Sequence, residues 1–291
     1  GAVSVEGDIY AALALKDHFQ SLALPARDKV SLLGLTLCLP VNATGQMPGG
    51  KSRRWRTLRD DPFSRKHSRS RDRKAIAFHY GISNDFYRLW LDERMVYSCA
   101  YFEDQDECLD QAQRNKLEHI CRKLRLKPGE RLLDIGCGWG ALIRWAAQHY
   151  GARAHGVTLS RNQYEYGQAK IREEGLQGLV TLELRDYRAL DGEAAFDKIV
   201  SVGMFEHVGL KNLPLYFGTA QRLLKPGGLF LNHGITHDEE GWRKTLSTQF
   251  INRYVFPDGE LDTVSNVQRV MERSGFEILD VESLRPHYAL T

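Results

Sequence analysis

The segment from Leu132 to Gly140, LLDIGCGWG, constrains the fold of this chain more than any other. An apolar run with an acid near its end leads into three glycines that alternate over five positions. Gly136 and Gly138 permit backbone torsions that other residues resist, and they let the backbone approach a ligand closely. Residues 141–150 have helical apolar spacing and no breaker. The segment therefore predicts a strand, a tight loop and a helix, the unit that binds nucleotide-like ligands in parallel α/β sheets.

The glycine spacing also excludes one class of site. A Gly-x-Gly-x-Gly run lacks the wider Gly-x-x-Gly step and the lysine of a phosphate-binding loop. A tight turn without a ligand is the structural alternative. The Asp-x-Gly-x-Gly-x-Gly form resembles the first motif of S-adenosylmethionine-dependent methyltransferases.

The rest of the second half alternates between strand and helix patterns. This alternation predicts an α/β, doubly wound parallel sheet with right-handed crossovers, whose ligand lies at the carboxyl ends of the strands. A Lys-Pro-Gly-Gly stop ends the helix before the fifth strand. The strand candidates are Arg131–Ile135, Ala152–Thr158, Val180–Glu183, Lys198–Val202, Gly228–Asn232 and Phe276–Val281.

Two regions precede this domain. With 291 residues, the chain can hold a large core and a smaller second module. We predict a partial N-terminal, lipid-associated module at 1–50, a basic linker at 51–74 and the main domain at 75–291. The linker carries eleven Lys and Arg against three Asp, while the net charge of the whole chain is only +3. It is either a solvated connector or an arm attracted to an anionic membrane surface. Nucleic acid is disfavoured because the basic core of this stretch has one aromatic residue, Trp55, and no stacking platform for bases is evident.

Cysteine usage and apolar runs indicate the compartment. The longest apolar stretch, 32–41, is too short to span a bilayer, and no secretory signal opens the chain. Five scattered cysteines favour a reducing cytoplasm and show no metal-ligand spacing. We expect a cytoplasmic protein that associates with membranes peripherally.

Polar residues follow the second and third strands. Ser160 and Gln163 have the spacing of a capping box. Thr158 stands where many dinucleotide sites have a carboxylate for the ribose, and Gln163 can supply the missing polar contact. Asp186 can accept from an exocyclic amine at the adenine position, where Tyr187 offers a flat face.

Three further segments carry a family resemblance. They are MVYSCAYF at 95–102, SVGMFEHVG at 201–209 and NHGIT at 232–236, preceded by aromatic residues from position 79. Together they closely resemble the cyclopropane-fatty-acid synthase family, which includes the mycolic acid cyclopropane synthases. The resemblance covers about residues 75–291, and that of the N-terminal module is weaker. It implies a Rossmann-like class I methyltransferase fold. We expect its last antiparallel strand to be missing, because the chain stops about ten residues after Val281. Phe86 and Trp90 are expected in the core.

The resemblance implies a reaction. The family transfers the sulfonium methyl group of S-adenosylmethionine to a cis double bond of a lipid acyl chain, which produces a carbocation. A base, a bicarbonate ion in related members, then removes a proton so that a cyclopropane ring closes. The implied substrate is an unsaturated phospholipid at a membrane surface.

Site residues follow from the same resemblance. Bicarbonate contacts map to the backbone of Cys99 and Ile235 and to the side chains of Glu206, His233 and Tyr288. Three of them have a structural alternative: Cys99 as a buried small hydrophobe, Glu206 as a solvated acid and His233 as a core histidine. Tyr288 stands three residues from the end of the chain, so the helix that would anchor it is in doubt. The cofactor contacts map to Tyr80, Tyr97, Ser98, Gly136, Gly138, Thr158, Leu159, Gln163, Asp186, Tyr187 and Val202. No metal site is expected.

Three alternatives to ring formation stay open. The same scaffold can stop at methylation and give a branched acyl chain, or it can methylate an alkaloid nitrogen, which needs no anion site. A non-catalytic, membrane-surface lipid-binding protein is the third. The acyl length, headgroup and oligomeric state are open, with a homodimer as one alternative.

Overall fold

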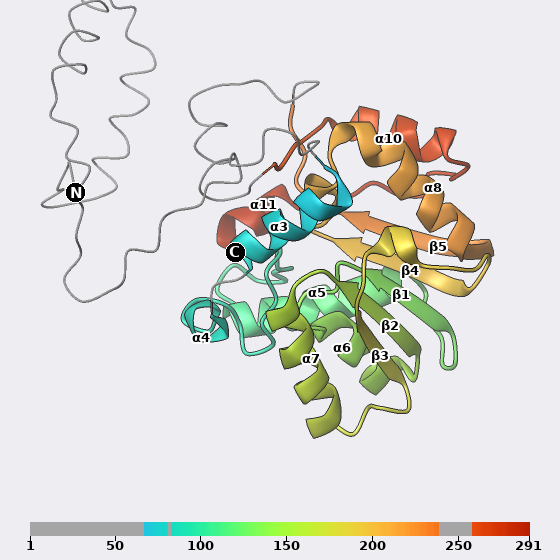
Figure 1. The fold of residues 1–291 in the computed structure, drawn as a ribbon. Helices are drawn as coiled ribbons and strands as arrows, with labels where there is room; N and C mark the ends of the chain where they lie inside the picture. The colour runs from blue at the N-terminus through green and yellow to red at the C-terminus, as the bar shows by residue number, and fades with distance from the viewer. Residues whose placement is uncertain (1–66, 81–82, 239–257) are drawn as a thin grey trace, which may run out of the picture. The chain divides into compact units, whose positions relative to one another are not determined.

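Five of the predicted apolar segments form one parallel sheet in the computed structural model, which describes residues 67–80, 83–238 and 258–291. The strand order is β3-β2-β1-β4-β5, and every neighbouring pair is parallel (Figure 1). This confirms the doubly wound α/β sheet. The strands are β1 (Arg131–Ile135), β2 (Arg153–Thr158), β3 (Val180–Leu184), β4 (Phe196–Val202) and β5 (Leu224–His233).

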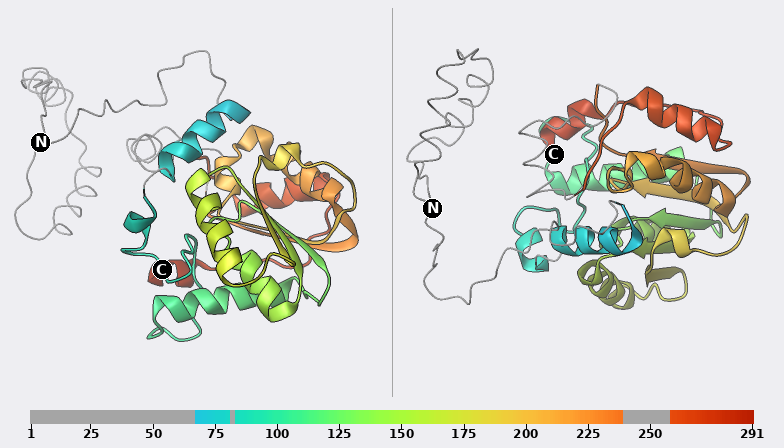
Figure 2. Two further views of the ribbon diagram at one scale, coloured as in Figure 1. Left: turned by 60° about the horizontal axis from the view of Figure 1, so that its bottom comes forward. Right: turned by 45° about the horizontal axis from the view of Figure 1, so that its top comes forward.

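Helices cover both faces of this sheet, as Figures 1 and 2 show. Successive side chains of a strand point to opposite faces, so Leu132 joins one hydrophobic cluster and Leu133 the other; both are fully buried. The first cluster contains residues of α5 (Leu109–Lys123), α6 (Ala141–Tyr150) and α7 (Arg161–Glu173). The second contains residues of α8 (Leu213–Leu223) and α10 (Val264–Arg273). The end of α8 at Leu223 confirms the predicted helix stop.

Further helices and turns complete the described part of the domain. They are α3 (Arg69–His79), α4 (Asn84–Tyr87), α11 (Arg285–Leu290) and three 3-10 turns, η2 (Tyr187–Ala189), η3 (Phe205–His207) and η4 (Leu210–Asn212). Helix α3 begins where the Ser68 side chain accepts a hydrogen bond from the Arg71 N–H. It crosses the predicted boundary between linker and domain. The module at 1–50 and the linker up to residue 66 lie outside the described residues, so these boundaries stay predictions.

The sixth predicted strand, Phe276–Val281, is wrong: the described structure assigns no strand there. The Phe276 ring packs on Phe230 of β5, with centroids 5.4 Å apart. After Phe276, the side chains of Asp280 and Glu282 form ion pairs with Lys123 of α5. The segment is held by these charges and makes no ladder of backbone hydrogen bonds.

No helix in the described ranges is both long and apolar enough to cross a membrane.

Candidate active site

The glycine loop after β1 has the backbone that the sequence predicts. Gly136 has a φ of +83° and Gly138 a φ of +55°, which side chains resist. A Cβ atom at Gly136 would lie only 2.7 Å from Cγ of Met204. The N–H groups of Gly136 and Cys137 both donate to the carbonyl oxygen of Val157 in the neighbouring strand β2. The loop is thus fixed at the carboxyl edge of the sheet.

The end of β2 forms a small network of polar contacts beside this loop. The Thr158 hydroxyl donates to Oε1 of Gln163 at 2.7 Å and accepts from the Ser160 N–H at 3.1 Å. The Ser160 hydroxyl accepts from the Gln163 N–H and caps α7. Ser160 is therefore a cap, but the reciprocal half of a capping box is absent here because Thr158 takes the Ser160 N–H. Gln163 itself lines the neighbouring cavity.

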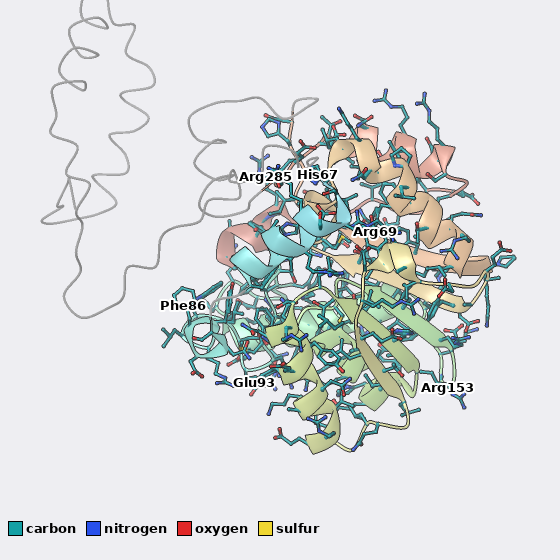
Figure 3. The ribbon with its side chains drawn as sticks, viewed as in Figure 1. His67, Arg69, Phe86, Glu93, Arg153 and Arg285 are labelled. Atoms are coloured by element: carbon teal, nitrogen blue, oxygen red, sulfur yellow. The ribbon has the colours of Figure 1, made fainter. Side chains whose placement is uncertain are left out.

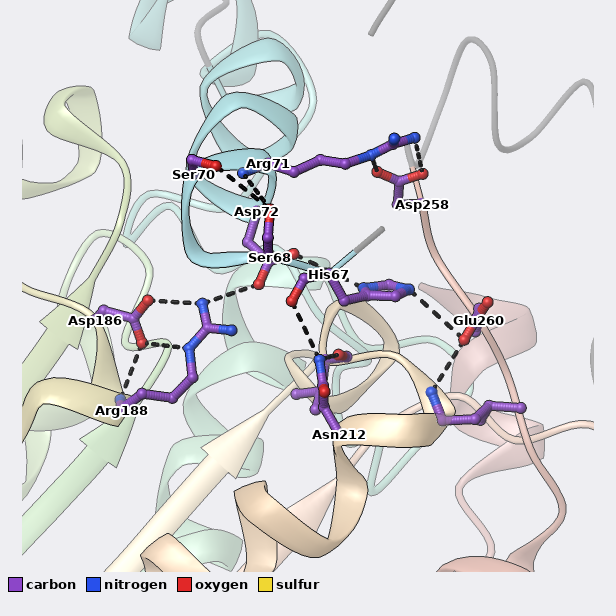
Figure 4. A network of polar contacts seen from close by, with 12 residues as sticks. His67, Ser68, Ser70, Arg71, Asp72, Asp186, Arg188, Asn212, Asp258 and Glu260 are labelled. Carbon is purple, nitrogen blue, oxygen red and sulfur yellow. Dashed lines mark hydrogen bonds and ion pairs between the residues drawn. The ribbon is translucent and has the colours of Figure 1, made fainter. Parts of the chain in front are cut away.

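The third strand leads to a different arrangement from the predicted one. Both carboxylate oxygens of Asp186 accept from Arg188, at 2.7 to 2.9 Å. Nη2 of Arg188 also lies 2.9 Å from Oδ2 of Asp72 in α3 (Figure 4). Asp186 is therefore occupied by a cation of its own chain, whereas Tyr187 faces the ligand side.

Aromatic side chains form one wall of the site, and one of them, Trp139, belongs to the glycine loop itself. The ring centroid of Tyr80 lies 6.2 Å from that of Tyr97 and 6.1 Å from that of Trp139. Nε1 of Trp139 donates to Oδ1 of Asn84 at 2.8 Å and ties this wall to α4. The wall is thus anchored both to the glycine loop and to the segment before β1.

These pieces enclose one cavity at the carboxyl ends of β1, β2 and β4. Helix α3 covers part of it with Asp72, Ile76 and Tyr80. Of the predicted cofactor residues, Asp186 is not among those that line the cavity in the described part of the chain. The other ten line it: Tyr80, Tyr97, Ser98, Gly136, Gly138, Thr158, Leu159, Gln163, Tyr187 and Val202.

Glu206, in the turn after β4, is a buried acid near this cavity. Its Oε1 accepts from the Ile235 N–H at 2.8 Å. Its Oε2 is buried and has no hydrogen-bond partner among the described residues. Burial raises the pKa of Glu206 to about 7, against the lowering effect of the Ile235 N–H. The carboxyl is therefore not the solvated surface acid of the structural alternative.

The next predicted anion contacts are His233, Cys99 and Tyr288. His233 ends β5, and burial, aided by the charge of Lys116, lowers its pKa to about 4, so the imidazole is neutral. The Cys99 thiol is buried, which raises its pKa. Tyr288 lies on α11 and is half exposed. Its pKa is raised mainly by burial and further by the charges of Glu206 and Cys99. The helix that was in doubt is thus present, close enough for these residues to influence one another.

Ile235 lies beside Glu206. Its N–H is already donated to Glu206. It therefore fixes the orientation of that carboxyl, and of its backbone only the carbonyl group is left for an anion. Of the five residues, Ile235 is the one that positions another member of the set.

The two sets are neighbours in the chain as well as in space. Ser98 lines the cavity and Cys99 follows it, while Glu206 precedes His207, which also lines the cavity. The His207 ring packs against Tyr80 with centroids 6.4 Å apart. The predicted anion contacts and the cavity lining therefore adjoin at two pairs of consecutive residues, Ser98–Cys99 and Glu206–His207.

Two of the sequence expectations on the aromatic segment are wrong. Phe86 and Trp90 are not core residues; their exposed fractions are 44% and 43%, and that of Leu89 is 80%. Figure 3 shows Phe86 pointing away from the sheet. Trp90 still touches the wall, with its centroid 5.0 Å from that of Tyr97. An aromatic path therefore leads from the surface to the cavity.

The cavity residues that were missed from the sequence include two basic ones. Lys116 of α5 is buried and lines the cavity, and Arg188 joins α3 to η2. Lys116 could have been found, because it lies one turn from Ala112 and from Ile120 on the apolar face of an amphipathic helix. A lysine at such a position faces the interior.

Comparisons with known proteins agree with this geometry. Residues 67–291 match the family model described as mycolic acid cyclopropane synthetase. The chain is 50% identical over 232 residues to a probable fatty acid methyltransferase of Pseudomonas putida, a match covering 79% of this chain and 59% of that protein. It is 48% identical over 196 residues to the cyclopropane-fatty-acyl-phospholipid synthase of Escherichia coli, covering 67% of this chain and 48% of that protein. The chain thus spans about half the length of these curated relatives.

A solved structure shares both fold and sequence. It is mycolic acid cyclopropane synthase CmaA1 complexed with SAH and CTAB, with 37% identity and a TM-score of 0.68. The match covers 75% of this chain and 79% of that chain.

Proposed function

Because this chain belongs to the mycolic acid cyclopropane synthetase family, we propose that it binds S-adenosylmethionine in the cavity beside the glycine loop and transfers a methylene unit to the cis double bond of an unsaturated phospholipid acyl chain. The family membership confirms the resemblance read from the sequence, and with it the Rossmann-like class I methyltransferase fold. Substrate and product are our proposal.

The observation that carries the proposal is the position of Glu206. A desolvated carboxyl with one unpartnered oxygen lies next to a cavity whose lining includes ten of the predicted cofactor residues. An enzyme that methylates an amine needs no anion site, so this arrangement favours transfer to carbon.

The aromatic wall supports the same chemistry. An alkene is a weak nucleophile and has no proton for a base to remove first, so the residues must exclude water, align the methyl group with the double bond and stabilise the cation. The faces of Tyr80 and Tyr97 can attract a cation, with about 0.5–2 kcal/mol from each ring. Both rings are packed against other aromatic side chains, so little ordering is left to be done on binding.

The residues around Glu206 fit a small anion. Oε1 is fixed by the Ile235 N–H, so the proton of a neutral Glu206 would sit on Oε2, the oxygen without a partner, and would point at the ligand. Glu206, His233, Tyr288 and the backbone of Cys99 would hold the ion. When bound, bicarbonate would supply the base that accepts the proton lost as the ring closes.

A branched product is the second candidate, favoured by the name of the Pseudomonas putida relative, a probable fatty acid methyltransferase. Incubation of the full chain with unsaturated phospholipid vesicles and S-adenosylmethionine labelled with three deuterons on the methyl group separates the two. Ring closure removes one deuteron, so mass spectrometry should find a product with two. A methyl branch whose cation loses a proton from a neighbouring chain carbon keeps all three, and that product, or an unmodified lipid, would contradict ring formation. A methylene branch also keeps two deuterons, so ozonolysis, which cleaves an alkene and spares the ring, completes the distinction.

We also propose that Phe86, Leu89 and Trp90 meet the lipid surface, because they are exposed and lie at the outer end of the aromatic path. Burial of one leucine contributes roughly 1–2 kcal/mol. Leu89→Gln should therefore weaken binding to unsaturated phospholipid vesicles about five- to thirty-fold and leave affinity for S-adenosylhomocysteine unchanged. Leu279→Gln is the matched control, since Leu279 is 63% exposed on a segment that does not line the cavity. Equal losses in both variants would argue against this surface.

A further inference from the structure

Two side chains from successive turns of helix α5 form hydrogen bonds to one residue of the site, Ser98. Nε2 of Gln113 donates to the Ser98 carbonyl oxygen at 2.9 Å. Nζ of Lys116 donates to the Ser98 hydroxyl at 2.8 Å. Gln113 and Lys116 are three residues apart and lie on the same face of the helix. Both are almost fully buried, with exposed fractions of 1% and 4%. The backbone and the side chain of Ser98 are therefore held by one helix.

Ser98 belongs to a segment that contributes to both the cofactor cavity and the predicted anion site. Residues 96–99 begin where the Val96 N–H donates to Oδ1 of Asp92 at 2.6 Å. Tyr97 and Ser98 line the cavity, and Cys99 belongs to the predicted anion contacts. A movement of Ser98 would therefore displace contacts on both sides.

Lys116 is also a charged group between the cofactor cavity and the predicted anion site. Desolvation lowers its pKa to about 8, while Asp92, Asp134 and Cys99 favour its charged form. In turn, Lys116 opposes the rise that burial causes in the pKa of Asp134, which reaches about 7, and it disfavours a proton on His233. The groups that face it thus come from the 92–99 segment, from β1 and from β5.

We propose that Lys116 is a positioning residue that, through its hydrogen bond to Ser98, holds the 96–99 segment in the geometry needed by both the cofactor cavity and the anion site. What the two sites bind rests on the proposed function. The contact with Ser98 itself does not.

Calorimetry with S-adenosylhomocysteine tests this on the full chain. Lys116→Met should weaken binding at least ten-fold while circular dichroism shows a folded protein. Ser98→Ala should weaken it as well, and the double variant should be no weaker than Lys116→Met, because both changes remove one interaction. Arg122→Met removes a positive charge from an exposed position of the same helix and should bind like the wild type.

A pH series distinguishes positioning from a merely structural role. Affinity of the wild type should fall as the pH rises through about 8, where Lys116 loses its proton. This fall should vanish in Lys116→Met. Should that variant not fold, Lys116→Gln serves in its place, and Ser98→Ala, which keeps the lysine, should still flatten the pH series.

Several outcomes would overturn the inference. They are wild-type affinity in Lys116→Met, additive losses in the double variant, or an unchanged pH series. A wild-type chain that does not bind S-adenosylhomocysteine would instead overturn the proposed function, so the two failures are distinguishable.

Discussion

The Glu206 carboxyl accepts a hydrogen bond from the backbone N–H of Ile235, at 2.8 Å and across 29 residues of sequence. Glu206 stands in the turn after β4, and Ile235 follows the end of β5. The two strands are parallel neighbours, so the loops after them meet at the same edge of the sheet. The bond fixes one carboxyl oxygen, while the other, which is buried, has no hydrogen-bond partner within residues 67–80, 83–238 and 258–291.

Glu206→Gln tests the chemical role of this carboxyl. The amide keeps the shape and the Ile235 contact but cannot act as an acid or a base. We expect S-adenosylhomocysteine to bind within about two-fold of wild type, by calorimetry, and ring formation to fall about 100-fold or more. Glu272→Gln, at an exposed position of α10, is the control. An unchanged yield of cyclopropane lipid in Glu206→Gln would remove this residue from the site.

The raised pKa of Glu206 also predicts a pH dependence of stability. The folded state keeps a proton up to about pH 7, whereas the unfolded state releases it near its ordinary value of 4.5. The free energy of unfolding therefore falls as the pH rises between these values, by roughly 3 kcal/mol at most. Urea denaturation at pH 5 and pH 7.5 should show a smaller fall in Glu206→Gln. Identical changes in the two proteins would contradict the buried carboxyl.

Gly136→Ala should damage the cofactor cavity. The positive φ disfavours any side chain by roughly 1–2 kcal/mol, and the new Cβ would displace Met204, another cavity residue. We expect lower stability in urea and weaker binding of S-adenosylhomocysteine. Gly178→Ala is matched to it, since φ is not positive there and no atom lies within 4 Å of the added Cβ. If Gly136→Ala behaves like Gly178→Ala, the loop is not under this constraint.

Arg188→Gln should loosen α3. Arg188 lies between Asp186 and Asp72, and its removal leaves two buried carboxyls facing each other, which costs about 3–5 kcal/mol. Hydrogen exchange of residues 69–79 should become faster. Asp72→Asn added to this variant should restore part of the loss, and Arg161→Gln, at an exposed ion pair, should have no effect. Unchanged exchange in Arg188→Gln would mean that other contacts hold the helix.

Local pattern was enough to predict most of the sheet. Five apolar segments became strands, and the central ones, β1, β2 and β4, are mostly buried, as the full burial of Leu132 and Leu133 of β1 illustrates. The segment 276–281 has a similar pattern, but its neighbouring acids pair with Lys123, and a distant charge of this kind is not visible in a local window. The glycine torsions were predictable because few residues other than glycine adopt them.

The site was predictable as a set of residues but not as a set of partners. Asp186 has the right position in sequence, yet Arg188, two residues later, occupies its carboxylate. Phe86 and Trp90 look like core residues by type, but they lie outside the wall formed by Tyr80 and Tyr97. Which atom faces which depends on the packing of loops far apart in sequence.

Helix α3 supplies Asp72, Ile76 and Tyr80 to the cavity, although it precedes β1 by about fifty residues. Figure 4 shows how it is fastened, by ion pairs from Arg71 to Asp258 and from Asp72 to Arg188. The stretch of chain that forms the core and the stretch that encloses the ligand are therefore different. A recombinant fragment trimmed to the sheet and its covering helices would keep the first and lose the second, so its starting residue should be chosen upstream of His67.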